Sequence, residues 1–312
     1  MSEPIASISV VVPVYNSAGT LPALVEQLDG VTIGAAHARE LILVNDGSRD
    51  QSWDVIQALA LQYEWVRGIN LMRNYGQHNA LLAGIRAAVG EVTVTMDDDL
   101  QNPPSEIPKL LDQLGRGYDV VYGKPEAERH GFLRDLASRM TKLALQAAMG
   151  VETARNVSAF RAFRTQVREA FADYQSPYVS IDVLLTWGTS RFAAVAVRHE
   201  PRQASVSNYT FRRLIVHALN MMTGFSAIPL QIASLVGFAF TLFGLALLIL
   251  VVERYLTQGG KVPGFAFLAS AVAIFSGAQL FALGIIGEYL ARMHFRMMGQ
   301  PTYAVRTRTR DS

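Results

Sequence analysis

Short apolar runs alternate with longer amphipathic segments along the first third of the chain. The apolar runs are rich in β-branched residues and end in polar turns, which is typical of buried strands. The longer segments begin near capping residues and predict helices. Strands that alternate with helices indicate βαβ units, an α/β fold and a mostly parallel sheet covered on both faces. The predicted strands are residues 8–14, 40–45, 66–71 and 91–96, and the predicted helices are residues 17–27, 51–62 and 75–89.

Polar or turn-forming residues stand where these predicted strands end. Right-handed crossovers place the C-terminal ends of parallel strands along one edge of a sheet. Ligands of open α/β sheets bind at that edge. The sequence therefore predicts a ligand site formed by residues from several strands. The residues at the strand ends are Pro13, Asp46, Arg73 and Asp97–Asp99.

Three adjacent carboxylates follow the fourth predicted strand in the segment MDDDLQNPP, residues 96–104. Side chains alternate along an extended chain, so Asp97 and Asp99 are expected to point the same way and Asp98 the other way. Two carboxylates and the amide oxygen of Gln101 offer the hard oxygen ligands that Mg²⁺ or Mn²⁺ prefers. The alternative is a solvated acidic turn, but the position at the sheet edge favours a metal site.

The character of the chain changes after residue 227. Residues 228–252 and 262–287 carry no charged side chain, and each run exceeds the roughly 20 residues that a helix needs to cross a bilayer. Two such runs in succession favour membrane helices over buried helices of a soluble core. Arginines are concentrated before the first run and after the second, so both ends of the chain are expected on the cytoplasmic side.

These patterns predict the organisation of the whole chain. Residues 211–225 predict either a helix along the membrane surface, which would guide a lipid, or a plain helix packed on the domain. The arginines of the tail are expected to contact anionic lipid or to act as a topology signal. The predicted parts are a cytoplasmic α/β domain (1–208), an amphipathic juxtamembrane segment (209–227), a first membrane helix (228–253), a short external loop (254–261), a second membrane helix (262–288) and a basic cytoplasmic tail (289–312).

Composition narrows the classes of function. The 28 basic and 26 acidic residues nearly balance, so no general basic surface for nucleic acid is indicated. The chain has no cysteine, which excludes disulfides, thiolate nucleophiles and metals bound by cysteine. The N-terminus has no basic region before its first apolar run, so no cleaved signal peptide is expected.

Four blocks, in this order, resemble the family 2 glycosyltransferases, and more narrowly their polyprenyl-phosphate branch. They are VVPVYN (11–16), VNDGSRD (44–50), RNYGQHNALLAG (73–84) and MDDDLQNPPSEIP (96–108). The resemblance implies a GT-A, Rossmann-like domain and a nucleotide-diphospho-sugar donor, with a UDP-sugar favoured. It also implies an inner-membrane enzyme that transfers one sugar to a polyprenyl phosphate, such as undecaprenyl phosphate, with inversion. Relatives that form tetramers suggest a homo-oligomer.

The same resemblance implies roles for particular residues. Asp97 and Asp99, with Gln101, would hold Mg²⁺ or Mn²⁺ on the diphosphate. FRAFR (160–164) resembles an FRxxR block near the acceptor, so Arg161 joins Asp97, Asp99 and Arg202 in the predicted catalytic set. The predicted donor-binding residues are Pro13, Tyr15, Asp46, Arg73, Gln77 and Asp98. The predicted acceptor-phosphate residues are Arg202, Ser207, Tyr209, Arg212 and Arg213.

The sequence departs from the family pattern at several positions. Ser17 stands where the family usually has Glu, which puts the base contacts in question. Ser205 and Asn208 replace a Gly and a Lys of the acceptor block. The Asp that often precedes FRxxR is absent. A general base is not required, however, because a phosphate monoester with a second pKa near ~6 is already largely ionised at neutral pH.

Two other functions remain open on the sequence. A processive polysaccharide synthase is disfavoured because no QxxRW block is present and two spans are too few for a polymer channel. An inactive scaffold partner of a flippase is supported by Ser17, Asn208 and the absent Asp, but Asp97, Asp99 and Arg202 argue against it.

Overall fold

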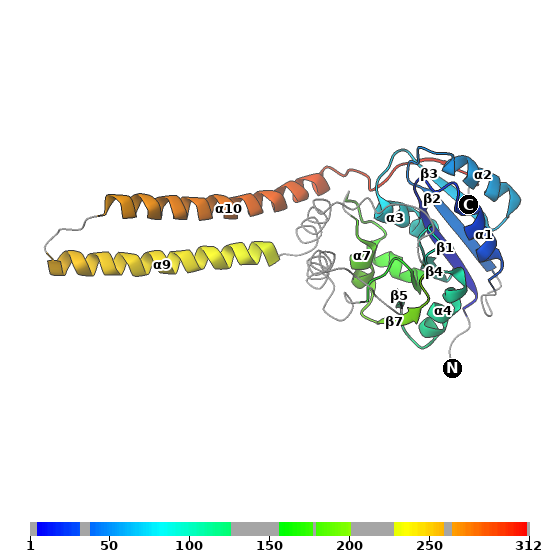
Figure 1. The fold of residues 1–312 in the computed structure, drawn as a ribbon, viewed down its shortest axis with the longest axis horizontal. Coiled ribbons are helices and arrows are strands. Elements are labelled where there is room, and N and C mark those ends of the chain that lie inside the picture. The colour runs from blue at the N-terminus through cyan, green and yellow to red at the C-terminus, as the bar shows by residue number, and fades with distance from the viewer. Residues whose placement is uncertain are drawn as a thin grey trace.

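The computed structural model describes residues 5–31, 38–125, 156–176, 179–200, 228–258 and 264–310. An α/β domain forms one end of the molecule, and a long pair of helices extends from it (Figure 1). The predicted α/β class with a mostly parallel sheet and two C-terminal apolar helices is confirmed.

The described strands form one mixed sheet in the order β7-β5-β6-β4-β1-β2-β3-β8. Its centre is parallel, because β1 pairs in parallel with both β2 and β4, and β2 with β3. β6 runs antiparallel between β4 and β5, and β8 runs antiparallel to β3. The strands are β1 (Ser7–Val14), β2 (Ala38–Asn45), β3 (Val66–Leu71), β4 (Val92–Thr95), β5 (Val120–Pro125), β6 (Arg161–Arg164), β7 (Phe192–Val197) and β8 (Val305–Arg308).

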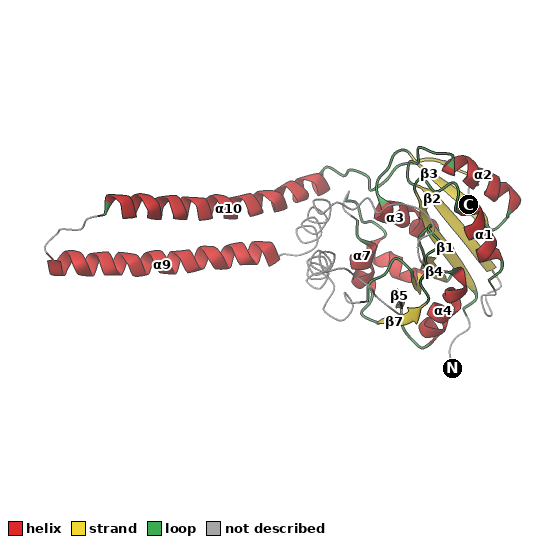
Figure 2. Cartoon of the chain, viewed as in Figure 1, coloured by secondary structure: helices red, strands yellow, loops and turns green. Residues whose placement is uncertain are grey.

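Helices cover both faces of this sheet, as the pattern of apolar runs predicts (Figure 2). One core cluster contains apolar side chains from α1, α2 and α4, and the other contains side chains from α3 and α7. Gly84 lets α3 approach the sheet closely, since a Cβ there would lie 2.3 Å from Val11 Cγ1. The helices are α1 (Leu21–Asp29), α2 (Ser52–Gln62), α3 (Gln77–Ala87), α4 (Ile107–Gly115) and α7 (Ile181–Gly188), with short 3₁₀ turns η1 (Pro104–Glu106) and η2 (Thr165–Phe171).

The ends of the helices differ from the prediction by a few residues. The first helix was expected from residue 17 but begins at Leu21, with Pro22 in its first turn. Proline is favoured there because its missing N–H has no helical partner at that position in any case. Ser17 is consequently left in the loop after β1, where its side chain can take part in the site.

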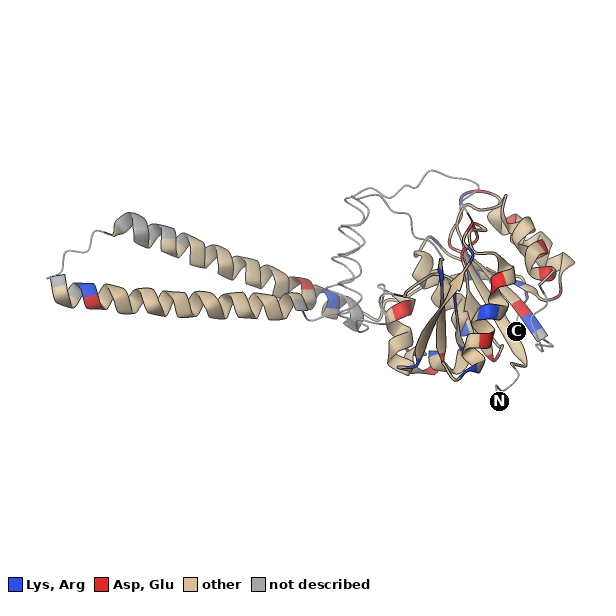
Figure 3. Cartoon of the chain, turned by 60° about the horizontal axis from the view of Figure 1, so that its bottom comes forward, with Lys and Arg blue, Asp and Glu red and all other residues tan. Residues whose placement is uncertain are grey.

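The two long helices expose apolar side chains along most of their length. α9 (Ile228–Gln258) and α10 (Phe265–Met297) contain candidate spans at Pro229–Arg254 and Ile274–His294, with mean hydropathies of 2.8 and 1.4. Among the described side chains, charge is confined to the ends of the hairpin (Figure 3). Exposed apolar surface of this extent is expected for helices in lipid and not for the core of a soluble domain. α9 also continues through residues 254–258, which were predicted to be an external loop.

The C-terminal tail contains structure that the sequence pattern did not predict. The chain returns from α10 to the α/β domain, where β8 covers the edge strand β3. Met72 N–H donates to the Ala304 carbonyl over 2.9 Å, and Thr309 N–H donates to the Gly68 carbonyl over 3.0 Å. Arg310 donates to the carbonyls of Glu64 and Ala60, both at 2.8 Å. These arginine contacts are with protein, so the tail anchors α10 to the domain.

Ending the chain at Gly299 is expected to destabilise the α/β domain by on the order of 3 kcal/mol. The reason is that the unpaired edge of β3 loses several hydrogen bonds worth about 1 kcal/mol each. Thermal unfolding of the detergent-solubilised protein measures this effect. Arg308→Gln is the matched control, because that exposed side chain can change without removing the strand. Equal melting of the truncated and full-length proteins would show that β8 does not stabilise the sheet.

Candidate functional site

A cleft of about 630 Å³ opens at the C-terminal edge of the parallel strands. It brings together predicted residues that are far apart in the sequence, as the strand-end argument requires. Val14, Asn74 and Gly76 also line it, although sequence reasoning did not select them. Its lining residues are Pro13, Val14, Tyr15, Asp46, Asn74, Gly76, Gln77, Asp97, Asp98, Asp99 and Gln101.

The loop after β1 forms one wall of this cleft. Tyr15 is 45% exposed, which leaves its ring available to a ligand. Asn16 joins this loop to the loop after β2, because its N–H donates to Ser48 Oγ at 3.0 Å and its Oδ1 accepts from Arg49 N–H at 2.8 Å. Arg73 is not among the lining residues, and its guanidinium lies 4.8 Å from the centre of the Tyr75 ring.

Asp46 holds the loop between β3 and α3 with both of its carboxylate oxygens. Oδ1 accepts from Tyr75 N–H at 2.7 Å, and Oδ2 accepts from Gly76 N–H at 2.8 Å. Burial raises the pKa of Asp46, and these two hydrogen bonds partly oppose the shift. Gly47 has a φ of 64°, and a Cβ there would lie 2.5 Å from the Arg73 carbonyl carbon. Asp46, which was predicted to bind the donor, therefore holds the backbone of one wall of the cleft in place.

Asp97 and Asp99 both line the cleft, but different neighbours orient them. Gln77 at the start of α3 donates from Nε2 to Asp97 Oδ1 over 2.7 Å. The Gln101 N–H donates to Asp99 Oδ1 over 3.1 Å. Within the described residues, no group of three or more His, Cys, Asp or Glu forms a metal-binding cluster. The available donors are therefore two carboxylates and the Gln101 amide, which suits Mg²⁺ or Mn²⁺ because such ions also take phosphate and water oxygens.

Asp98 lines the cleft together with Asp97 and Asp99, and all three residues are partly buried. Asp98 Oδ2 is buried and has no hydrogen-bond partner within the described part of the chain. The nearby Ser17 hydroxyl donates to the Tyr15 carbonyl over 3.2 Å. Burial raises the pKa of Asp98, and the neighbouring Asp99 charge raises it further. The alternation expected from the sequence is not seen here, because β4 ends at Thr95, Asp98 and Asp99 lie in a turn, and all three aspartates line the cleft.

Arg161 does not reach the cleft, which corrects the prediction that it acts on the acceptor. Its side chain is 2% exposed and is paired with buried Asp182. Arg161 Nε also donates to Thr95 Oγ1 over 3.1 Å, at the end of β4. The Tyr122 hydroxyl donates to Asp182 Oδ1 over 3.1 Å. Alternation along β6 could have indicated this burial, because Arg161 lies on the same face as fully buried Phe163.

The predicted acceptor residues Arg202, Ser207, Tyr209, Arg212 and Arg213 lie outside the described residues. The chain that precedes them packs on the loop after β4. Glu200 N–H donates to the Gln101 carbonyl over 2.8 Å, and His199 Nδ1 lies 3.3 Å from Asn102 Oδ1. The described stretch of residues 179–200 therefore ends beside the candidate metal ligands, immediately before the predicted acceptor block.

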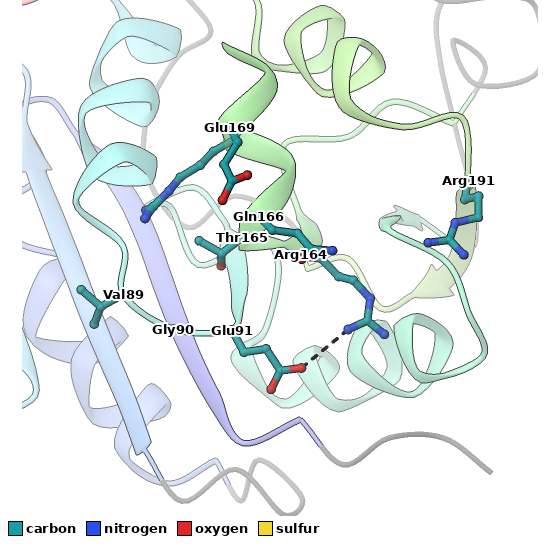
Figure 4. A pocket seen from close by; sticks show the side chains of 9 residues that line it. Val89, Gly90, Glu91, Arg164, Thr165, Gln166, Glu169 and Arg191 are labelled. Carbon is teal, nitrogen blue, oxygen red and sulfur yellow. Dashed lines mark ion pairs between the residues drawn. The ribbon is translucent and has the colours of Figure 1, made fainter. Parts of the chain in front are cut away.

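A second cavity, of about 650 Å³, lies at the opposite edge of the sheet beside the start of β4 (Figure 4). Three arginines line it, but each has an internal partner. Arg164 lies 3.6 Å from Glu91, and Arg191 lies 2.7 Å from Asp119. Arg168 donates to the Ile85 carbonyl over 3.0 Å at the end of α3. These pairings indicate that the three arginines of the second cavity have a structural role. The first cleft, which is lined by carboxylate and amide groups, is therefore the candidate site.

Comparison with known proteins agrees with this architecture. This chain is 36% identical over 309 residues to each of two undecaprenyl-phosphate 4-deoxy-4-formamido-L-arabinose transferases. One is from Yersinia pestis (strain Pestoides F), and the other is from Yersinia pseudotuberculosis serotype O:3 (strain YPIII). The match covers 98% of this chain and 94% of each relative. A crystal structure of glucosyl-3-phosphoglycerate synthase from Mycobacterium tuberculosis shares the fold, with a TM-score of 0.52 and 20% identity over 70% of this chain and 78% of that chain.

The model of the family "Glycosyl transferase family 2" matches residues 9–172, the part of the chain that carries β1–β6 and the oxygen-lined cleft. This match and the full-length relatives confirm the resemblance seen in the four sequence blocks. The chain belongs to glycosyl transferase family 2 and is a glycosyltransferase.

Proposed function

We propose that this enzyme transfers one sugar from a nucleotide-diphospho-sugar to a polyprenyl phosphate at the cytoplasmic face of the inner membrane. The observation that carries the proposal is the joining of a carboxylate-lined cleft to an exposed apolar hairpin within one chain. Relatives named for transfer to undecaprenyl phosphate match both parts, because the alignment covers 98% of this chain. A lipid acceptor explains why the domain and hairpin belong together.

Donor binding is assigned to the cleft at the sheet edge. The solved fold relative contains Mn²⁺ and UDP-glucose, which supports a divalent metal and favours a UDP-sugar here. Asp97, Asp99 and Gln101 are the residues that would hold Mg²⁺ or Mn²⁺. When bound, the ion would neutralise diphosphate charge and stabilise the departing nucleoside diphosphate. Gln77 would keep Asp97 in position through their 2.7 Å hydrogen bond.

The acceptor phosphate needs positioning and charge neutralisation but no general base. Its second pKa is near ~6, so its oxygen is already a nucleophile at neutral pH. We assign its binding to Arg202, Ser207, Tyr209, Arg212 and Arg213, since the chain enters this segment beside Gln101. Attack by that oxygen on the anomeric carbon, in line with the leaving diphosphate, inverts the configuration. The product would serve cell-envelope glycan or lipid modification.

The proposed topology follows from charge and from the hairpin. Both termini and the catalytic domain would face the cytoplasm, with two spans of the membrane between them. A homo-oligomer, such as a tetramer, would bury part of the apolar helix surface that one chain leaves exposed.

A panel of nucleotide sugars, tested with undecaprenyl phosphate in detergent, examines this proposal. We expect one UDP-sugar to give a lipid product carrying a single sugar, with loss of turnover in EDTA and recovery in Mg²⁺ or Mn²⁺. Mass spectrometry counts the sugars, and NMR assigns the anomer. Repeated addition would favour a processive synthase, and no turnover with any donor would favour the inactive scaffold.

A further inference from the structure

A buried carboxylate follows the candidate metal ligands, at the end of the turn η1. Glu106 is only 2% exposed, and a charged side chain is rarely buried to this extent unless it is paired. Its Oε1 accepts from Arg198 Nε over 2.8 Å, and its Oε2 accepts from the Arg198 backbone N–H over 3.2 Å. Lys109 in α4 donates to the same Oε2 over 2.5 Å. Arg198 also donates from Nη2 to Ser105 Oγ over 3.1 Å. Glu106 therefore joins η1 to the chain that leaves β7.

The two residues after Arg198 contact the same loop. Glu200 N–H donates to the Gln101 carbonyl over 2.8 Å. His199 Nδ1 lies 3.3 Å from Asn102 Oδ1. Three consecutive residues of the chain after β7 are thus each held by the loop after β4 or by η1. This contact of residues 198–200 with residues 101–106 is called the dock below.

The dock lies between the donor side and the acceptor side of the proposed reaction. Gln101 is a candidate metal ligand, and its N–H donates to Asp99 Oδ1 over 3.1 Å. Arg202, the first residue of the predicted acceptor set, follows Glu200 by two positions. The segment assigned to the acceptor phosphate therefore begins from a point that is fixed on the metal-binding loop.

The metal-binding loop is the more firmly held side of the dock. Leu100 packs against the core on one face of the sheet, and residues 102–104 are buried. Residues 198–200 are exposed. Loss of the dock is therefore expected to displace residues 198–200 and to leave the candidate metal ligands in place.

We propose that Glu106 is a positioning residue for the acceptor. By holding Arg198, it docks residues 198–200 on the metal-binding loop and sets where the acceptor segment starts relative to the diphosphate of the donor. This inference rests on the proposed polyprenyl-phosphate acceptor and deepens it. It also gives a role to the last acidic residue of the 96–108 block, which the sequence pattern left without one.

The direction of the change in acceptor KM tests the dock. Removing a negative charge would, by electrostatics alone, strengthen the attraction of an anionic phosphate. Glu106→Gln keeps the size of the side chain but replaces one acceptor oxygen with a donor group, so the dock should loosen. We expect the KM for undecaprenyl phosphate in detergent to rise about 10-fold, as for one lost hydrogen bond to a charged group. The KM for the UDP-sugar and the Mn²⁺ requirement are expected to stay within about 2-fold of wild type.

Arg198→Gln tests the other side of the dock. The Arg198 side chain is 61% exposed, so this variant is expected to fold even if Glu106→Gln does not. It should raise the acceptor KM by a similar factor of about 10, and the double variant should show no further rise because both changes remove the same contact. Lys109→Met is the matched control, because it removes the other cation that pairs with Glu106. Its acceptor KM is expected to stay within about 2-fold of wild type.

Hydrogen exchange gives a readout that does not depend on turnover. The backbone N–H groups of Arg198 and Glu200 both donate within the dock. In Glu106→Gln, a peptide that contains residues 197–200 is expected to exchange about 10-fold faster, because the local opening is easier. A peptide from β4 should exchange at the wild-type rate, which separates loss of the dock from general destabilisation of the sheet.

The outcomes separate the dock from the proposed function. Wild type that makes no lipid product overturns the proposed acceptor and, with it, the role of Glu106. An active wild type whose acceptor KM is unchanged or lowered by both Glu106→Gln and Arg198→Gln overturns the dock and leaves the proposed function intact. A rise in Arg198→Gln alone would mean that Arg198 binds the phosphate directly, and a rise only in the KM for the UDP-sugar would place Glu106 on the donor side. Either result overturns the dock.

Discussion

Replacing Asp99 with Asn is expected to slow sugar transfer by about 100- to 1000-fold, the loss typical when charge stabilisation of a leaving group is removed. Asn keeps the size of the side chain and an oxygen atom but removes the negative charge that attracts a divalent cation. Asp99 lies in the cleft beside Gln101, where it accepts that residue's N–H at 3.1 Å. The expected defect is therefore in metal use, and higher Mn²⁺ concentration should recover part of the rate.

Asp112→Asn provides a matched control on the surface of α4. Asp112 pairs with Arg116 one turn away, and both side chains are more than 60% exposed. Exposed pairs of this kind contribute about 0–1 kcal/mol, so activity and melting temperature are expected to stay near wild type. The comparison is made as initial rate against Mn²⁺ concentration at saturating donor. A rate for Asp99→Asn within threefold of wild type at every Mn²⁺ concentration would remove the metal from the proposed mechanism.

Local patterns were sufficient to predict the central sheet and most of the cleft. Parallel strands carry their C-terminal ends to one edge, so residues following separate strands could be placed together without any knowledge of distance. Asp46, Gln77 and Asp97–Asp99 meet there in the structure. The alternation predicted for Asp97, Asp98 and Asp99 was wrong, because it requires extended backbone and the chain turns at Asp98 and Asp99 after β4 ends at Thr95.

Contacts between distant segments could not be predicted in this way. β8 has only a short alternating pattern, and nothing in Val305–Arg308 indicates that its partner is β3, more than 230 residues earlier. Its arginines were assigned to a contact with anionic lipid or to a topology signal, because charge alone does not distinguish a headgroup from a backbone carbonyl. Arg161 was misplaced because the family block was given more weight than the alternation with Phe163.

Arg161→Met is expected to destabilise the α/β domain by about 3–5 kcal/mol, because it leaves the buried carboxylate of Asp182 without its cation. Asp182 is 5% exposed, and within the described part of the chain it would keep the hydrogen bond from the Tyr122 hydroxyl. Met resembles the aliphatic part of Arg in volume, so the expected loss is electrostatic and not a cavity effect. Urea unfolding followed by tryptophan fluorescence reports on the correct region, since Trp53, Trp65 and Trp187 all lie in this domain.

The Arg161→Met/Asp182→Asn double variant separates burial of charge from a role in catalysis. Asn is neutral and still accepts from Tyr122, so the double variant is expected to recover more than half of the lost stability. Arg116→Met, which breaks the exposed pair with Asp112, should change stability by less than about 0.5 kcal/mol.

Arg161 supports Thr95 immediately before the metal-binding loop, so the folded double variant is expected to lose about 10- to 100-fold in rate. A well-folded double variant with a far larger loss would show that Arg161 contacts the reacting groups, contrary to its buried position in the structure.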